Sequence, residues 1–471
     1  MEANQVTKKT HYQTLQININ IRERTMTLDD RLQNVAVIGA AGKMGSGIAL
    51  LLAQEMTLQK LQPGNRDKNF DLVLIDVSDT ALKGLLQYLK TQAVKLAEKN
   101  IVNLRNLYQE RNDLVENAEF IDQFVDDVFL NLRTGTDLGL ARDAQMVFEA
   151  IVENVDVKES VLKKLNGQCS DTTFYFTNTS SIPIQLIDEK VGLQGRIIGY
   201  HFYNPPAVQK LVELISPENI NPELQEVALE LGKRLRKTLI PANDIAGFIG
   251  NGHFMRDGLH ALKEVGKLNK EFSLTEAIYI LNRVSQDFLI RPMGIFQLID
   301  YVGIDVFQLI LKTMNPYFTD EDLHSDLIDQ MVEKKVLGGQ NPDGSQKNGF
   351  LQYEKSRPTG VFDPVSAQYQ LFDSGDWQKK LDKKIGDLPE GYMPWRQFLM
   401  DPQKDEKLSA YFKKLKGSKS MGTQLALVYQ KRSKAIGNQL VSQGVANKPE
   451  DVNGVLLNGF YHLYGPINDY I

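Results

Sequence analysis

The stretch Val35–Ala49 reads VAVIGAAGKMGSGIA and decides the fold of the first half of the chain. Its glycines, Gly39, Gly42 and Gly45, follow a short apolar run and open a segment with helical spacing. A glycine-rich turn between a strand and a helix is typical of loops that bind dinucleotides. The usual fingerprint is G-x-G-x-x-G, and the first step here is one residue longer.

Each glycine has a role in such a loop. Gly39 permits the sharp turn, Gly42 lets the backbone approach a pyrophosphate, and Gly45 lets the helix pack close to the sheet. The free N–H groups at the start of the helix favour phosphate, so we also assign Lys43 and Met44 to the cofactor site. The alternative is a glycine-rich bend that binds nothing, but the flanking strand and helix favour a nucleotide.

The next apolar run, LVLID, ends at Asp76. A carboxylate at this position accepts hydrogen bonds from the ribose hydroxyls of adenosine and repels a 2′-phosphate, which favours NAD over NADP. The polar insertion before Phe70 explains the long separation from the last glycine. Asp76 as a simple turn residue is the alternative.

Apolar runs alternate with helical stretches from Leu32 to about Leu239. The runs NVAVIG, DLVLID, MVFEAI, TFYFTN, RIIGYHF and KLVELI are nearly continuous in apolar residues, as in strands buried on both faces. We therefore predict an α/β fold, a Rossmann-like doubly wound parallel sheet covered by helices. After Pro241 helical periodicity prevails, which predicts all-α domains.

These patterns divide the chain into five parts: an N-terminal extension (1–30), a NAD-binding domain (31–240), a first helical unit (241–345), a linker (346–380) and a second helical unit (381–471). In the extension, YQTLQININIRE alternates and could form an edge strand. In the second helical unit, EDVNGVLLNGFYHLYGPINDYI echoes TEAIYILNRVSQDFLIRPMGIFQLIDYVG of the first. A duplication explains the echo; two unrelated amphipathic helix pairs are the alternative.

Composition excludes several classes of function. The 471 residues carry a net charge of −5, so no basic surplus exists to bind nucleic acid. The single cysteine, Cys169, rules out an intrachain disulfide and a thiolate metal cage, and we expect no metal. No apolar run is long enough to cross a membrane. The N-terminus lacks the apolar stretch of a signal peptide, so we expect a cytoplasmic location.

One histidine of the six closes a predicted strand of the first domain: His201, in RIIGYHFYNPP. Open α/β sheets place their sites at the carboxyl ends of strands. Glu213 lies in the next strand, where an unpaired buried carboxylate is costly, and His201 is its natural partner. Such a pair orients the imidazole and stabilises the imidazolium that forms on proton abstraction. A lone strand-end histidine is more often structural.

Six segments in order make the chain resemble the 3-hydroxyacyl-CoA dehydrogenase family: IGAAGKMGSGIA, VFEAIVENVDVKESV, TNTSSIPI, RIIGYHFYNPPAVQKLVELI, DIAGFIGN and PMGIFQLIDYVGID. They span roughly Val35–Val306. The longer glycine loop is the main departure from the family pattern.

The resemblance implies roles for particular residues. His201 is similar to the family's general base for the substrate 3-hydroxyl, and Glu213 to its partner carboxylate. Ser180 and Asn204 match residues near the reacting oxygen. Asn251 matches an asparagine supplied by the helical domain, which implies a site in the interdomain cleft. Turn chemistry is the alternative for Ser180 and Asn204.

The resemblance also implies that Glu153 and Lys158 contact the nicotinamide side of NAD; solvated charges at a strand end and a helix start are the alternative. Asn178, in the same turn as Ser180, is assigned to the cofactor site or to a cap. For the CoA contact we name Lys95 and Lys83, although a solvated helix face explains both equally well.

The sequence thus predicts an NAD-dependent dehydrogenase of 3-hydroxyacyl-CoA in fatty acid β-oxidation. A dehydrogenase of a free 3-hydroxyacid is one alternative, and a non-catalytic NAD-binding protein of the same fold is another. We expect a monomer, in which the second helical unit acts as an internal partner, or a homodimer formed through the helical domain.

Overall fold

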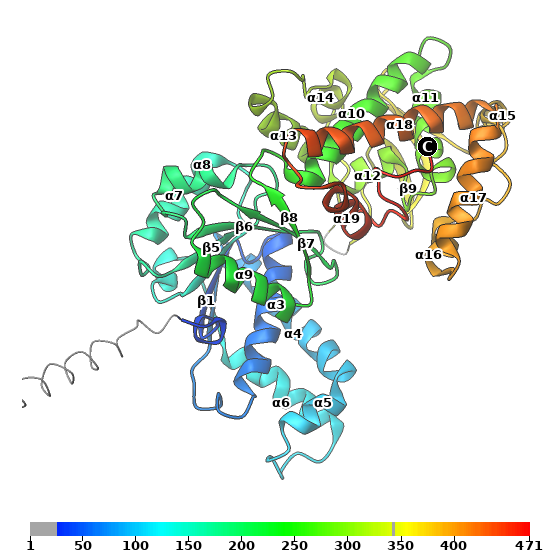
Figure 1. Cartoon of the computed structure of the whole chain (residues 1–471). Coiled ribbons are helices and arrows are strands. Elements are labelled where there is room, and N and C mark those ends of the chain that lie inside the picture. The colour runs from blue at the N-terminus through cyan, green and yellow to red at the C-terminus, as the bar shows by residue number, and fades with distance from the viewer. Residues whose placement is uncertain (1–25, 342–343) are drawn as a thin grey trace, which may run out of the picture.

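The computed structural model describes residues 26–341 and 344–471 (Figure 1). It shows a sheet domain beside a helical region; the last strand of the sheet ends at Asn243, three residues beyond the predicted boundary at 240. The predicted edge strand near the N-terminus lies outside the described residues. None of the helices within the described ranges is long and apolar enough to cross a membrane.

Eight strands form the main sheet in the order β3-β2-β1-β4-β5-β6-β7-β8. They are β1 (Asn34–Ile38), β2 (Asp71–Ile75), β3 (Leu132–Gly135), β4 (Met146–Glu149), β5 (Phe174–Thr177), β6 (Ile197–Phe202), β7 (Leu211–Ser216) and β8 (Thr238–Asn243). The sheet is mostly parallel, which confirms the predicted Rossmann-like class, but β6 and β7 pair antiparallel. The sequence did not predict β3 and β8, because these edge strands are short of buried residues.

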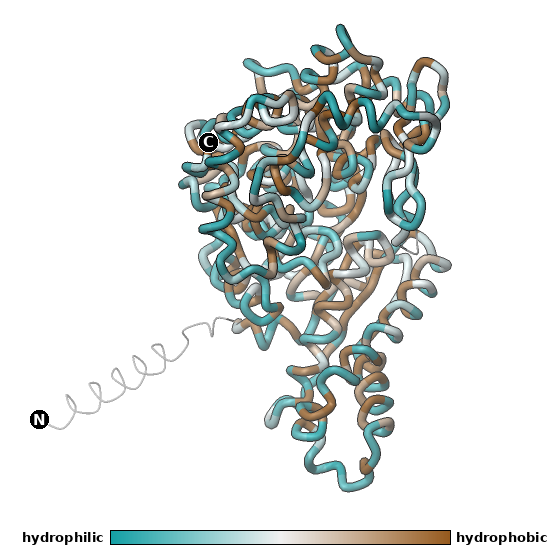
Figure 2. The backbone as a smooth tube through the Cα atoms, turned by 90° about the vertical axis from the view of Figure 1, so that its right-hand side faces the viewer, coloured by the Kyte–Doolittle hydropathy of each residue, from teal (hydrophilic) through white to brown (hydrophobic). Residues whose placement is uncertain are grey.

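Helices cover both faces of the sheet. One face packs against α3 (Lys43–Lys60), α4 (Asp79–Lys99) and α9 (Pro222–Arg234), and α2 (Leu28–Arg31) packs on α9. The helices α5 (Ile101–Leu107) and α6 (Asn117–Leu130) pack on α4 and extend the same apolar core. The other face packs against α7 (Val155–Asn166), α8 (Ile184–Val191) and a 3-10 turn, η1 (Leu138–Ala141). Figure 2 shows hydrophilic residues at the lower end of the molecule, where Figure 1 places α5 and α6.

The first helical unit has one long helix and several shorter ones. They are α10 (Phe248–Leu268), α11 (Leu274–Arg283), the π-helical turn η2 (Val284–Phe288), α12 (Ile295–Val302), α13 (Ile304–Met314), the 3-10 turn η3 (Asn315–Tyr317) and α14 (Asp326–Glu333). The second contains α15 (Trp377–Ile385), α16 (Trp395–Met400), α17 (Lys404–Gly417), α18 (Met421–Ser442) and α19 (Pro449–Gly459). One apolar core joins the two units.

The stretch 346–380, expected as a linker, instead contains a three-stranded antiparallel sheet: β9 (Leu351–Glu354), β10 (Arg357–Asp363) and β11 (Gln368–Leu371). Lys355 and Ser356 form the turn between β9 and β10, Pro364 begins the turn between β10 and β11, and Pro358 and Gly360 lie within β10 itself. Phe350 and Val361 are fully buried in the core of the helical region. The small sheet is therefore part of the helical region, which is not purely α.

The predicted repeat is partly visible in the order of the helices. In each unit a long helix, α10 or α18, is followed by a short one, α11 or α19. The first unit continues into α12, whereas residues 460–471 of the second form no helix. α18 lies along α10 and η2, and α19 packs on β7 and β8 (Figure 1). The second helical unit thus completes one face of the sheet.

Candidate active site

The glycine loop joins β1 to α3 with the geometry that the sequence predicted. Gly39 has a φ of +77°, and a Cβ at Gly45 would overlap the carbonyl oxygen of Gly39. Helix α3 therefore begins directly against the end of β1. Its N-cap is Gly42, and no side chain caps the helix. The first amides of α3 are consequently available to an anion.

Asp76 follows β2 directly and lies beside the glycine loop. Its Oδ2 accepts a hydrogen bond from the Ala41 amide at 2.9 Å. Lys43 is the first residue of α3 and is exposed, while Met44 is partly buried against the core of the sheet domain. The predicted cofactor residues of this loop therefore gather at the carboxyl ends of β1 and β2.

The first helical unit approaches the same loop. The Lys43 ammonium lies 6.0 Å from the centre of the Tyr301 ring. Partial burial, and then the charge of Lys347, lower the pKa of Lys43. Lys347 belongs to the segment before β9. Asp300 of α12 holds this segment in place, because its carboxylate accepts hydrogen bonds from the amides of Phe350 and Leu351. Nothing in the sequence marked Lys347, because its place depends on this tertiary contact.

His201 and Glu213 face each other across the antiparallel strands β6 and β7. The His201 Nδ1 lies 2.9 Å from the Glu213 Oε2. Glu213 is fully buried and His201 is 8% exposed. Since an ionised carboxylate only accepts hydrogen bonds, Nδ1 carries the proton and Nε2 is free to accept one. The fold therefore brings the two predicted partners within hydrogen-bond distance.

Glu213 is hydrogen-bonded to more than histidine. Its Oε1 accepts the backbone amides of Ile249 and Gly250, each at 3.0 Å, in the first turn of α10. Its Oε2 also accepts the Tyr203 hydroxyl at 2.9 Å. A carboxylate at a helix N-terminus is favourable for the amides and for the helix dipole. Glu213 therefore joins the sheet domain to the first helical unit.

The turn after β5 carries Asn178 and Ser180 to the same end of the sheet. The Asn178 Oδ1 accepts the amide of Phe202, the residue after His201, at 2.9 Å. The Asn251 amide group donates to the Ser180 carbonyl oxygen at 3.0 Å. This bond joins Asn251, from the first helical unit, to the turn that carries Ser180.

Glu153 accepts several hydrogen bonds from the turn that follows β5. Its Oε1 accepts the hydroxyls of Thr179 and Ser181 at 2.7 and 2.8 Å, and the Ser180 amide at 2.9 Å. Burial acts to raise the pKa of Glu153, but Lys158 and these hydrogen bonds outweigh it and hold the pKa below its usual value. The carboxylate stays ionised and fixes the backbone around Ser180.

Lys158 is buried, so the interpretation of a solvated charge is wrong. Its side chain is 1% exposed and its Nζ lies 2.7 Å from Glu149 Oε1 and 3.5 Å from Glu153 Oε2. Burial opposes the charge, yet the two carboxylates raise the pKa of Lys158. The ammonium is occupied by these carboxylates rather than turned to a cleft.

The remaining predicted residues make no hydrogen bond or ion pair with His201 or Glu213 among the described residues. Asn204 is partly buried in the turn after Tyr203, and its side chain makes no hydrogen bond to any described residue. Lys83 and Lys95 are exposed on α4, and no contact among the described residues brings them to the histidine. Tyr203 and Glu149 were not among the residues predicted from the sequence. The spacing could have indicated Tyr203, because side chains two residues apart in an extended segment point to the same face.

A groove opens beside the segment that follows His201. It has a volume of 330 Å³ and is lined by parts of α3, α4, α5, the segment 207–210 and the segment 234–237. Four basic residues contribute to it: Lys210, Arg234, Arg236 and Lys237. Burial lowers the pKa of Lys237 to about 8. Glu55 also lines the groove and pairs with Arg234, which leaves Lys210, Arg236 and Lys237 without an ion pair to a described residue.

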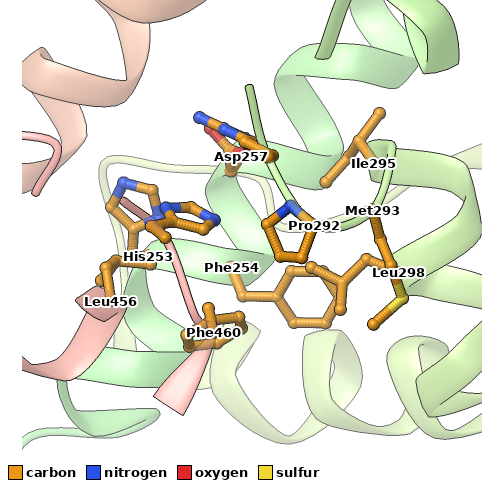
Figure 3. A pocket seen from close by; sticks show the side chains of 11 residues that line it. His253, Phe254, Asp257, Pro292, Met293, Ile295, Leu298, Leu456 and Phe460 are labelled. Carbon is orange, nitrogen blue, oxygen red and sulfur yellow. Dashed lines mark hydrogen bonds and ion pairs between the residues drawn. The ribbon is translucent and has the colours of Figure 1, made fainter. Parts of the chain in front are cut away.

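A second cavity, shown in Figure 3, lies between the two helical units and shares no lining residue with the groove. Pro292, Met293 and Leu298 line one side, and Leu456 of α19 and Phe460, the residue after this helix, line another part. Its volume of 20 Å³ fits about one water molecule. It is too small to serve as a substrate site.

Comparisons with known proteins agree with this geometry. A family model described as 3-hydroxyacyl-CoA dehydrogenase, NAD binding domain, matches residues 34–245, and one described as the C-terminal domain of the same family matches residues 281–348. The chain is 28% identical over 321 residues to the mitochondrial hydroxyacyl-coenzyme A dehydrogenase of Homo sapiens, covering 67% of this chain and 91% of that protein.

Two further relatives extend the comparison. The chain is 26% identical over 327 residues to a probable 3-hydroxyacyl-CoA dehydrogenase of Caenorhabditis elegans, covering 69% of this chain and 97% of that protein. The crystal structure of 3-hydroxybutyryl-CoA dehydrogenase from Escherichia coli is similar with a TM-score of 0.61 and 21% identity, covering 93% of this chain and 90% of that chain. The last likeness concerns the fold, and its coverage extends into the second helical unit.

Proposed function

Because the chain belongs to the 3-hydroxyacyl-CoA dehydrogenase family, whose members are NAD-dependent oxidoreductases, we propose that it oxidises 3-hydroxyacyl-CoA to 3-oxoacyl-CoA, or catalyses the reverse. The observation that carries the proposal is the His201–Glu213 pair at 2.9 Å, next to a turn that the helical unit also contacts. In this proposal the reaction serves fatty acid β-oxidation.

His201 acts as the general base. Its Nε2 takes the proton of the substrate 3-hydroxyl, while Glu213 holds Nδ1–H and stabilises the imidazolium that results. NAD, when bound, supplies the acceptor for the hydride. Ser180 and Asn204 hold the substrate oxygen on which negative charge develops, and Asn251 fixes the turn that carries Ser180.

The glycine loop fits NAD. The uncapped start of α3 faces the pyrophosphate, with Lys43 and Lys347 close by. Asp76 receives the ribose hydroxyls and disfavours the 2′-phosphate of NADP. Asn178, Glu153 and Lys158 shape the nicotinamide end. Lys158 is buried between carboxylates, so its part in this proposal is to position Glu153.

The basic groove supports a CoA thioester over a free acid. Lys210 and Arg236 are exposed beside it, and neither forms an ion pair with a described residue. A free 3-hydroxyacid would end near His201 and leave this groove unused. The CoA phosphates carry charge complementary to it, with Lys95 and Lys83 on α4 as further contacts.

The decisive experiment compares two substrates of the same acyl group. NADH formation is followed at fixed pH with 3-hydroxyacyl-CoAs of short, medium and long chain, and with the corresponding free acids. We expect a kcat/KM at least about 10²-fold higher for the thioester, because remote binding energy is used at the reacting centre. Equal rates would favour the free-acid dehydrogenase. NAD binding without turnover of either substrate would favour a non-catalytic protein.

We further propose that the protein is a monomer. In the family the helical domain is the expected subunit interface, and here α18 and α19 of the second helical unit already lie on α10 of the first. Gel filtration with light scattering is expected to give the mass of one chain. A dimer whose contacts fall within 244–313 would contradict this arrangement and support the homodimer. The cytoplasmic location stays a prediction.

A further inference from the structure

The Tyr203 hydroxyl and the His201 imidazole share one oxygen of Glu213. Both donors lie 2.9 Å from Oε2. Tyr203 follows His201 by two residues, so the two side chains leave the chain on the same face, and their ring centres are 4.9 Å apart. The arrangement gives the catalytic carboxylate a second donor that competes with the histidine.

The Tyr203 hydroxyl stays protonated and donates its hydrogen to Glu213. Burial, and then the neighbouring Glu213, raise the pKa of Tyr203 well above its ordinary value. With the amides of Ile249 and Gly250 on Oε1, the carboxylate has four donors in all. Each of them stabilises the ionised carboxylate and reduces the attraction that is left for an imidazolium.

Two helices enclose the tyrosine ring. A Cβ at Gly250 of α10 would overlap the Tyr203 hydroxyl oxygen, and a Cβ at Gly459 of α19 would lie 2.6 Å from its Cε1. The Phe460 ring meets the Tyr203 ring edge to face, with centres 5.8 Å apart. The last residue of α19, from the second helical unit, therefore fits against Tyr203 only as glycine.

The residues packed around His201, Glu213 and Tyr203 are mostly uncharged. From β8, Ile240 stands beside Glu213 in register. From α10, the Phe248 ring lies 6.2 Å from the His201 ring. Gly459, the last residue of α19, and Phe460 after it are uncharged. Among the described residues, Glu213 is the charged group that acts on Tyr203.

We propose that Tyr203 is a positioning residue of the His201–Glu213 pair, and that α19 of the second helical unit holds its ring in place. By donating to Oε2, Tyr203 limits how strongly Glu213 retains a proton on His201, which keeps the imidazole free to act as a base at lower pH. The inference rests on the proposed function for its catalytic meaning.

The test is Tyr203→Phe, which removes the hydroxyl and keeps the ring. The acid limb of the pH profile of kcat/KM is expected to move to higher pH by about 0.5–1 unit. The matched control is Tyr200→Phe, because Tyr200 lies in β6, three residues before Tyr203, and donates to the Ala228 carbonyl oxygen instead of to Glu213. The control profile is expected to stay in place. An unmoved profile for Tyr203→Phe, or equal shifts in both variants, would overturn the role of the hydroxyl.

A second readout does not depend on turnover. The histidine Cε1 resonances are titrated by NMR, with the His201 signal assigned by its loss in His201→Gln, and the same upward shift is expected for Tyr203→Phe. If no acyl-CoA is turned over but this titration moves, the proposed function fails and the inference on Tyr203 stands. If turnover is normal and the titration does not move, the inference fails alone.

The contribution of α19 is tested with Gly459→Ala. The added methyl displaces the tyrosine ring, so the His201 titration is expected to shift in the same direction as in Tyr203→Phe. Gly266→Ala is the control, since a Cβ at Gly266 of α10 meets no atom within 4 Å. A Gly459→Ala variant that is folded and titrates as the wild type would overturn the role of α19.

Discussion

Replacing His201 with glutamine is expected to lower kcat by about 10²–10⁴-fold, the range typical of an essential general base. Glutamine keeps a polar side chain of similar length opposite Glu213 but cannot take the hydroxyl proton. Affinity for NAD, measured by fluorescence titration, is expected to change little, because the glycine loop lies at other strands of the sheet.

His324→Gln is the matched control for this substitution. His324 is an exposed histidine that pairs with Asp329 outside the candidate site, so its removal is expected to leave kcat within about twofold. A folded His201→Gln variant with a wild-type rate would remove the proposed mechanism. Equal losses in both variants would point to a general effect on folding.

Lys158→Met is expected to destabilise the protein by about 3–5 kcal/mol, the usual cost of removing one partner of a buried ion pair. The change leaves Glu149, which is 1% exposed, and Glu153 facing each other without a cation. Their repulsion also loosens the turn that carries Ser180, so kcat/KM is expected to fall in the fraction that remains folded.

The control for Lys158→Met comes from the same helix. Lys163 of α7 pairs with Glu159, but its side chain is 52% exposed, so Lys163→Met is expected to cost less than about 1 kcal/mol. Denaturant unfolding of both variants gives the comparison. A Lys158→Met variant as stable as Lys163→Met would mean that the two carboxylates do not depend on the lysine.

The sequence carried the parts of this protein that depend on local structure. The turn from β1 into α3 needs glycine where φ is positive and where two backbones touch, so Gly39 and Gly45 could be interpreted without coordinates. Strands buried on both faces stand out as apolar runs, and the partners His201 and Glu213 fall in consecutive strands. The edge strands β3 and β8 lacked this signal because β3 has no buried residue and β8 has only two.

Only the tertiary structure decided which charges are buried and which donors share an acceptor. Lys158 reads as a solvated residue of an amphipathic helix, yet α7 packs it between two carboxylates. Tyr203 reads as one more aromatic residue, and its bond to Glu213 exists because α10 and α19, encoded far along the chain, close around it. The periodicity of apolar residues predicts which face of a helix or strand is buried. It does not predict which side chains from distant parts of the sequence surround a charge or share its hydrogen-bond acceptor.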